Sequence, residues 1–188
     1  MILGSATENA ATENAEVLTI KENYMVQRLL DAKDHLGTNV VSSDELREAQ
    51  LLKLVVNAVI NPLTAIFNCK NGQLVDQEPR VSLMKLLIKE IGPVVRALLP
   101  ALRQDASRFS DGKLLELVLT VAEATGKNTS SMLQDIQAER KTEIDYINGY
   151  IVSRGKQLDL LCPNNMVLTE MVKGKRVIDN NAIHHHFA

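Results

Sequence analysis

The run from Leu51 to Phe67 constrains the fold of this sequence most, because a helix of such composition is apolar nearly all round and must be buried. Three polar residues interrupt the run at intervals of four, namely Lys53, Asn57 and Asn61, and every residue between them is apolar. On a helix, this spacing places the three side chains in one row on one face. We therefore predict a buried helix over about 44–68 that carries a single polar row.

Two interpretations of this polar row remain open. Buried polar groups need hydrogen-bond partners, so Asn57 and Asn61 could bond to neighbouring helices while Lys53 reaches solvent. Alternatively, the row could line a cleft for a small, oxygen-rich anion, because lysine offers a charge and a proton and each amide offers donors and an acceptor. One lysine and two asparagines in register favour the cleft, with Lys53 partly buried and suited to proton donation.

The remaining pattern is helical almost throughout, so we predict an all-α fold. The other predicted helices cover about 22–36, ending at Gly37; 80–99, interrupted at Gly92-Pro93; 111–125, capped by Ser110; 129–158; and 163–175. We also predict a short extended piece at 39–41, capping hydroxyls from Ser42 and Ser43, and a turn at Asn71-Gly72.

A second polar group lies at the start of the helix predicted over 129–158. Asn128, Ser130 and Ser131 stand where backbone N–H groups and small polar side chains can bind an anion. An ordinary N-cap also explains them, and taken alone that interpretation is preferred. Glu143 lies further along the same predicted helix, where a solvated face explains it.

The bulk composition excludes several classes of function. With 188 residues and a formal net charge of −2, the chain has no basic footprint for nucleic acid. No stretch reaches the ~20 continuous apolar residues of a membrane span, so we expect a soluble, cytoplasmic protein with neither nucleic-acid nor membrane partners. Cys69 and Cys162 are predicted to be reduced and packed.

The ends of the chain differ in composition from its middle. The letters ATENA occur twice within residues 6–15, which indicates a low-complexity lead-in or linker over 1–20. We predict the helical domain over 21–178 and a polar tail over 179–188. His184, His185 and His186 belong to this tail, and we interpret them as solvated rather than as a metal site.

Two long stretches resemble the substrate domain of ketopantoate reductases, also called 2-dehydropantoate 2-reductases. They are KLVVNAVINPLTAIFNCKNG (Lys53–Gly72) and NTSSMLQDIQAERKTEIDYING (Asn128–Gly149), and Pro163-Asn164-Asn165 also fits. The resemblance covers about 46–173. It implies an all-helical domain like the C-terminal domain of 6-phosphogluconate dehydrogenases. It also implies reduction of ketopantoate to (R)-pantoate with NADPH, a step toward pantothenate and coenzyme A.

The same resemblance assigns roles to individual residues. It implies that Lys53 is the catalytic lysine, which protonates the developing alkoxide, and that Glu143 is a catalytic glutamate paired with the substrate hydroxyl and the lysine. The substrate-binding residues that it implies are Asn57, Asn61, Asn71, Asn128 and Ser131.

The sequence departs from the family in one large respect. Family members begin with a Rossmann domain whose Gly-rich turn holds the NADPH pyrophosphate, and no G-x-G-x-x-G occurs in this chain. The helix ending near Leu36, the piece at 39–41 and residues 1–4 would be remnants of that domain. Alone, the chain is then expected to bind pantoate weakly and to catalyse nothing.

Two other functions remain open at this point. One is a non-enzymatic helical module kept for dimerisation or partner binding, and the other is a related reductase of another 2-keto acid. A small 2-keto acid is the expected ligand of either reductase, and the resemblance allows a homodimer.

Overall fold

The computed structural model describes residues 2–3, 24–37, 39–99 and 106–174. By its internal contacts the chain divides into two units, Met1–Leu51 and Leu52–Ala188. The ATENA repeat and the histidines at 184–186 lie outside the described residues. The domain boundaries predicted above therefore stay predictions.

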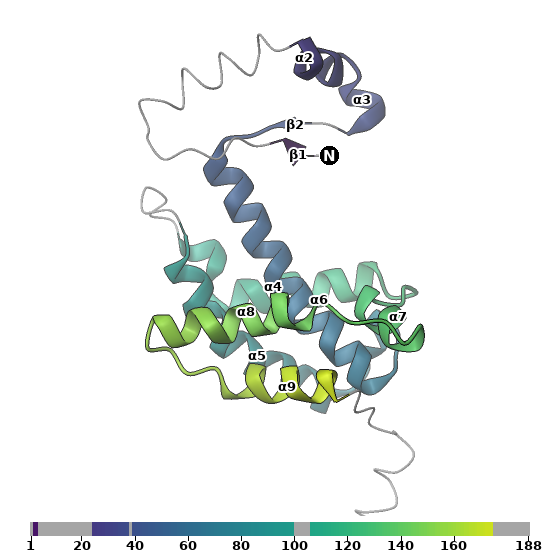
Figure 1. Cartoon of the computed structure of the whole chain (residues 1–188), viewed down its shortest axis with the longest axis vertical. Helices are drawn as coiled ribbons and strands as arrows, with labels where there is room; N and C mark the ends of the chain where they lie inside the picture. The colour runs from purple at the N-terminus through teal and green to yellow at the C-terminus, as the bar shows by residue number, and fades with distance from the viewer. Residues whose placement is uncertain (1, 4–23, 38, 100–105, 175–188) are drawn as a thin grey trace, which may run out of the picture. The chain divides into compact units, whose positions relative to one another are not determined.

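The first unit contains a small parallel pairing of strands. Its elements are β1 (Ile2–Leu3), α2 (Tyr24–Asp31), α3 (Lys33–Leu36) and β2 (Asn39–Val40) (Figure 1). Ile2 pairs with Asn39, and because the strands run parallel, the chain must cross over between them, with α2 and α3 in the connection. The predicted extended piece is thus confirmed. The predicted end of the helical segment at Gly37 is confirmed, with φ 59° there. The single helix predicted over 22–36 is wrong, because the segment is divided at Ala32 into α2 and α3.

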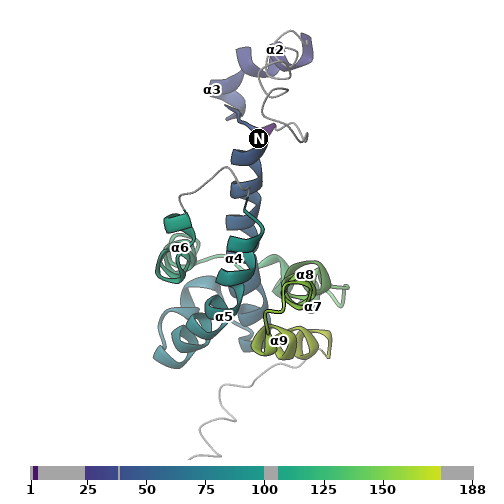
Figure 2. The same cartoon turned by 90° about the vertical axis from the view of Figure 1, so that its left-hand side faces the viewer.

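Every element of regular structure in the described part of the second unit is a helix, and the all-α prediction is confirmed. Its elements are α4 (Ser43–Phe67, which begins in the first unit), η1 (Asn71–Leu74), α5 (Glu78–Ala97), η2 (Ala106–Phe109), α6 (Asp111–Ala124), α7 (Ser131–Gln137), α8 (Ile144–Gln157) and α9 (Pro163–Lys173). Helices α8 and α9 lie side by side, and α6 lies across the C-terminal part of α4 from them (Figures 1 and 2).

Helix α4 begins and packs as its sequence predicts. The Glu45 N–H donates to the Ser42 hydroxyl at 3.2 Å, and the Ser42 N–H donates back to the Glu45 carboxylate at 2.9 Å. This reciprocal capping box satisfies two N–H groups that a helix start otherwise leaves unpaired. The C-terminal half of α4 is the centre of the core, where Val55, Ala58 and Val59 are fully buried.

The length and composition of α4 would also allow a membrane span. Of its most apolar stretch, 67% is buried inside the structure. The core helix of a globular domain meets the same criterion, so this helix alone is weak support for a span.

The long helix predicted over 129–158 is wrong, because two helices, α7 and α8, occupy this region with a connection between them. Glu139 adopts a left-handed backbone with φ 56°. Its N–H donates to the Ile136 carbonyl, and the Arg140 N–H donates to the Asp135 carbonyl at 2.7 Å. These two bonds form a Schellman motif, which ends α7. Sequence reasoning missed it because a glutamate stands where glycine usually marks such an end.

The same left-handed ending recurs at two other helices. Asn68 follows α4 with φ 45°, and Asp159 follows α8 with φ 56°. The hydrogen bonds from the Cys69 N–H to the Thr64 carbonyl and from the Leu160 N–H to the Gly155 carbonyl correspond to the Arg140–Asp135 bond at the end of α7. None of the three residues is glycine, so the left-handed backbone carries a steric cost of about 1 kcal/mol at Glu139 and a smaller one at Asn68 and Asp159, whose residue types adopt this conformation more readily.

We expect Glu139→Gly to stabilise the protein by about 0.5–1 kcal/mol, because glycine adopts φ 56° without the Cβ clash. The midpoint of urea unfolding measures this effect. Asp159→Gly should shift the midpoint in the same direction. Glu116→Gly, in the middle of α6, should lower stability by about 1 kcal/mol. A fall in stability for Glu139→Gly would contradict the assignment of its backbone.

The interruption predicted at Gly92-Pro93 is also wrong, since α5 continues through both residues. A proline inside a helix removes one backbone donor and does not always end the helix. Ile91 and Val94, on either side of the pair, are fully buried, and their packing outweighs one missing hydrogen bond.

Both cysteines are free and buried, as predicted. Burial raises the pKa of the Cys69 thiol, an effect that the Arg80 guanidinium opposes and the Asp76 carboxylate reinforces. Burial also raises the pKa of the Cys162 thiol, and the Glu90 carboxylate adds to the rise. Both groups therefore remain protonated packing residues.

Candidate functional site

The polar row of α4 runs from solvent into the core. Lys53 is exposed, Asn57 is half-buried and Asn61 retains 8% of its exposure. Among the described residues, none of the three side chains has a hydrogen-bond or ion-pair partner. The interpretation in which neighbouring helices satisfy the asparagines is therefore not what the structure shows. The expectation that Lys53 is partly buried is wrong, because it lies too near the solvent end of the row.

A hydroxyl pair holds the start of α7 against α4. The Thr64 and Ser130 hydroxyl oxygens lie 2.6 Å apart, and Ser130 accepts the Leu133 N–H at 3.2 Å as the N-cap of α7. Thr64 follows Asn61 by about one turn of helix, so this contact brings the exposed Ser131 close to the buried end of the polar row.

A backbone contact holds the segment before α7 as well. The Asn71 N–H donates to the Asn128 carbonyl at 3.1 Å, and the Gly72 N–H donates to the Gly126 carbonyl at 3.2 Å. A Cβ on Gly72 would lie 2.8 Å from the Gly126 Cα, so only glycine permits this approach. The Asn128 side chain is left exposed beside the α7 start.

The Asn71 side chain is buried, to the same extent as that of Asn61. Its Nδ2 donates to the Thr125 hydroxyl at 2.9 Å, while its Oδ1 is buried and lacks a partner among the described residues. This contact links η1 to the end of α6. Its substrate-binding role stays a prediction.

Glu143 is exposed and occupies the N-cap position of α8 without a side-chain capping bond. Five residues later, Asn148 donates to the Ala58 carbonyl at 2.8 Å, so α8 meets α4 beside Asn57. At 1.5 Å per residue, Glu143 lies about 7.5 Å along α8 from this meeting point. Because a non-helical connection separates α7 from α8, Ser131 and Glu143 lie at the starts of two separate helices.

Sequence reasoning missed a hydrogen-bond network at the start of α9, which runs from exposed to buried residues. The Glu90 carboxylate accepts four hydrogen bonds at the start of α9: from the Asn164 N–H and Nδ2 at 2.9 and 2.6 Å, and from the Asn165 N–H and Nδ2 at 3.0 and 2.7 Å. Asn148 then donates to the Asn165 Oδ1 at 3.0 Å. The N-cap interpretation given for the start of α7 is confirmed at Ser130, whereas no local pattern marks Glu90 or Asn148.

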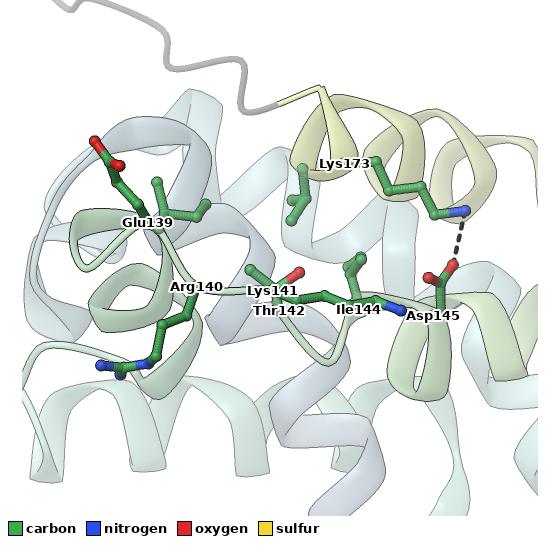
Figure 3. A pocket seen from close by; sticks show the side chains of 9 residues that line it. Glu139, Arg140, Lys141, Thr142, Ile144, Asp145 and Lys173 are labelled. Atoms are coloured by element: carbon green, nitrogen blue, oxygen red, sulfur yellow. Dashed lines mark ion pairs between the residues drawn. The ribbon is translucent and has the colours of Figure 1, made fainter.

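The pocket drawn in Figure 3, of about 320 Å³, lies between the α7–α8 connection and the end of α9. Lys173 pairs there with Asp145 at 2.7 Å, and hydrogen bonds to the carboxylates of Asp145 and Glu170 raise the pKa of Lys173. Thr142 and Ile144 line the pocket, but Glu143 does not, nor does any other predicted site residue. It is therefore distinct from the candidate site.

The described geometry defines a helical domain with an unpaired lysine–asparagine row beside two helix starts. The family described as "Ketopantoate reductase PanE/ApbA C terminal" matches residues 45–176. The chain is also 39% identical to the 2-dehydropantoate 2-reductase of Shigella flexneri over 147 residues, which cover 78% of this chain and 45% of that protein. The chain belongs to the ketopantoate reductase family, and the match is to its helical C-terminal domain.

Solved structures agree with this assignment. The PanE/ApbA family ketopantoate reductase from Ralstonia eutropha JMP134 superposes with a TM-score of 0.65 at 26% identity, covering 93% of this chain and 50% of that one. A D-mandelate dehydrogenase in complex with NADH gives 0.63 at 26% identity, covering 73% and 54%. The chain thus spans about half the length of the relatives it matches.

Proposed function

We propose that this chain is the substrate-binding domain of a cytoplasmic 2-dehydropantoate 2-reductase, which converts ketopantoate to (R)-pantoate. The observation that carries the proposal is the unpaired row of Lys53, Asn57 and Asn61 beside the start of α7. The row leads from the exposed Lys53 through the half-buried Asn57 to the buried Asn61, so a small polar ligand can enter from solvent and bond to all three side chains.

Each side chain has a defined task in this proposal. The two asparagine amides hydrogen-bond the substrate oxygens, and the Lys53 ammonium attracts the anion and supplies a proton to the oxygen of the reduced carbonyl. Ser131 and Asn128, both exposed beside the start of α7, hydrogen-bond the substrate carboxylate through their side chains. Glu143 accepts a hydrogen bond from the substrate hydroxyl.

The residues of this chain do not fit the dinucleotide that such a reduction needs. A pyrophosphate cradle requires a glycine-rich turn after the first strand, and only Gly4 occurs between β1 and Gly37. We propose that NADPH is the reductant and that groups other than the described residues hold it. The chain alone should bind pantoate without oxidising NADPH. A homodimer stays a prediction, which sedimentation of the purified chain measures.

Titration of the ¹⁵N-labelled chain with (R)-pantoate tests the proposal. We expect a dissociation constant near the millimolar range, with the largest shifts at the Asn57 and Asn61 side-chain amides and at the Ser131 N–H. Lys53→Ala should weaken binding about tenfold, because one charge-assisted hydrogen bond is lost. Lys85→Ala, on the exposed face of α5, is the matched control and should leave binding unchanged.

Mandelate is the control ligand, because a structural relative is named as a D-mandelate dehydrogenase. Equal affinity for mandelate and pantoate would favour a different 2-keto acid as the substrate. Shifts confined to the pocket of Figure 3, or none at all, would contradict the proposed site.

A further inference from the structure

Helix α4 contains a break in its hydrogen-bond ladder inside the polar row. Pro62 lies within the helix and has no N–H, so the carbonyl four residues earlier, that of Ala58, lacks its normal helical donor. Ala58 follows Asn57 and precedes Asn61, and its side chain is fully buried. A buried carbonyl without a donor is costly, so something else must supply one.

Asn148 supplies the missing donor. Its Nδ2 lies 2.8 Å from the Ala58 carbonyl oxygen, and the side chain is fully buried. The second proton of the same Nδ2 goes to the Asn165 Oδ1 at 3.0 Å. The amide of α8 therefore replaces the backbone donor that Pro62 removes from α4.

The Glu90 carboxylate fixes the orientation of the Asn165 and Asn148 side-chain amides. The Glu90 carboxylate can only accept, so the Asn165 Nδ2 must face it and the Asn165 Oδ1 must face Asn148. Asn148 is then left with both of its protons directed at acceptors, one of which is Ala58. No other orientation of the two amides satisfies all of these contacts.

We propose that Asn148 is a positioning residue. By donating to the Ala58 carbonyl, which Pro62 leaves without a helical donor, it fixes the orientation of the Lys53–Asn57–Asn61 row relative to Glu143. The proline ring crowds the Ala58 carbonyl and forces it away from the helix axis, toward a donor outside α4. That donor stands on α8, the helix that Glu143 begins. The two parts of the site are therefore joined through one hydrogen bond. This inference rests on the function proposed above.

A double-mutant cycle between Pro62 and Asn148 tests the hydrogen bond. Asn148→Leu keeps the approximate volume and removes the donor, so we expect the thermal midpoint to fall by about 5–10 °C. Pro62→Ala restores the backbone N–H. In that background, the decrease in thermal midpoint caused by Asn148→Leu should be smaller by about 3 °C. Pro93→Ala, the matched proline in α5, should leave the fall unchanged. If Asn148→Leu lowered the thermal midpoint equally in the wild-type and Pro62→Ala backgrounds, the proposed role of Asn148 as the replacement donor would be overturned.

Pantoate affinity separates positioning from simple stability. Pro62→Ala should remain at least as stable as the wild type and yet bind pantoate about tenfold more weakly, because the orientation of the Lys53–Asn57–Asn61 row changes. Unchanged affinity in this variant, with the wild type binding normally, would overturn the positioning role alone. If the wild type itself bound no pantoate, the proposed function would fall, and the positioning role with it.

Discussion

Replacing Gly155 with valine is expected to destabilise the protein by about 3 kcal/mol or more. Gly155 is buried in α8, and a Cβ at this position would lie 2.7 Å from the Leu160 carbonyl oxygen and 2.8 Å from the Cys162 sulfur. The first of these atoms is backbone, in the left-handed ending of α8, so it cannot move aside without opening the bond from the Leu160 N–H to the Gly155 carbonyl. Overpacking of this kind typically costs about 1–3 kcal/mol, and valine adds two further methyl groups.

Equilibrium urea unfolding followed by circular dichroism measures this loss. Gly112→Ala is the matched control, because a Cβ there meets no atom within 4 Å, and we expect a gain of up to about 1 kcal/mol. Gly155→Ala should also lower the free energy of unfolding. Adding Cys162→Ala to it should recover only part of that loss, since the clash with the Leu160 oxygen remains. A Gly155→Val protein as stable as the wild type would show that α8 and α9 do not pack as described.

Glu90→Gln is expected to lower stability by about 2 kcal/mol, although it changes shape very little. The carboxylate accepts four hydrogen bonds from Asn164 and Asn165. A glutamine must direct its NH₂ group toward one pair of these donors, and it also removes a negative charge from the start of α9. The larger part of the loss comes from donors that are left facing a donor.

Thermal unfolding of Glu90→Gln beside Glu123→Gln tests this expectation. Glu123 is exposed near the end of α6, so its substitution should change stability by no more than about 0.5 kcal/mol. Glu90→Asp should fall between the wild type and glutamine, since it keeps the charge but shortens the reach. Equal stability of the two glutamine variants would remove Glu90 from the interactions that hold α9 in place.

Sequence periodicity was sufficient for α4, α6 and α9, whose apolar spacing and end signals agree. It failed at Glu139, because the left-handed residue that ends α7 is not glycine, and at Pro93, because buried neighbours keep α5 helical. Composition and spacing also identified the α4 row, since a lysine in an apolar run is conspicuous.

Long-range partners were not predictable from the sequence. Asn148 and Glu90 each depend on groups distant in the chain, and nothing near either residue records the partner. The exposure of Lys53 was also misjudged, because helical spacing gives the face of a residue but not how far along the helix solvent reaches.

The contacts that hold the segment before α7 have a consequence for the thermodynamics of ligand binding. The Asn71–Asn128, Gly72–Gly126 and Thr64–Ser130 contacts immobilise that segment during folding, before any ligand arrives. A ligand that binds there need not order the backbone, so little conformational entropy is lost on association. Calorimetry of pantoate binding should accordingly show a small heat-capacity change, set by the apolar surface that the ligand covers and not by refolding of the chain.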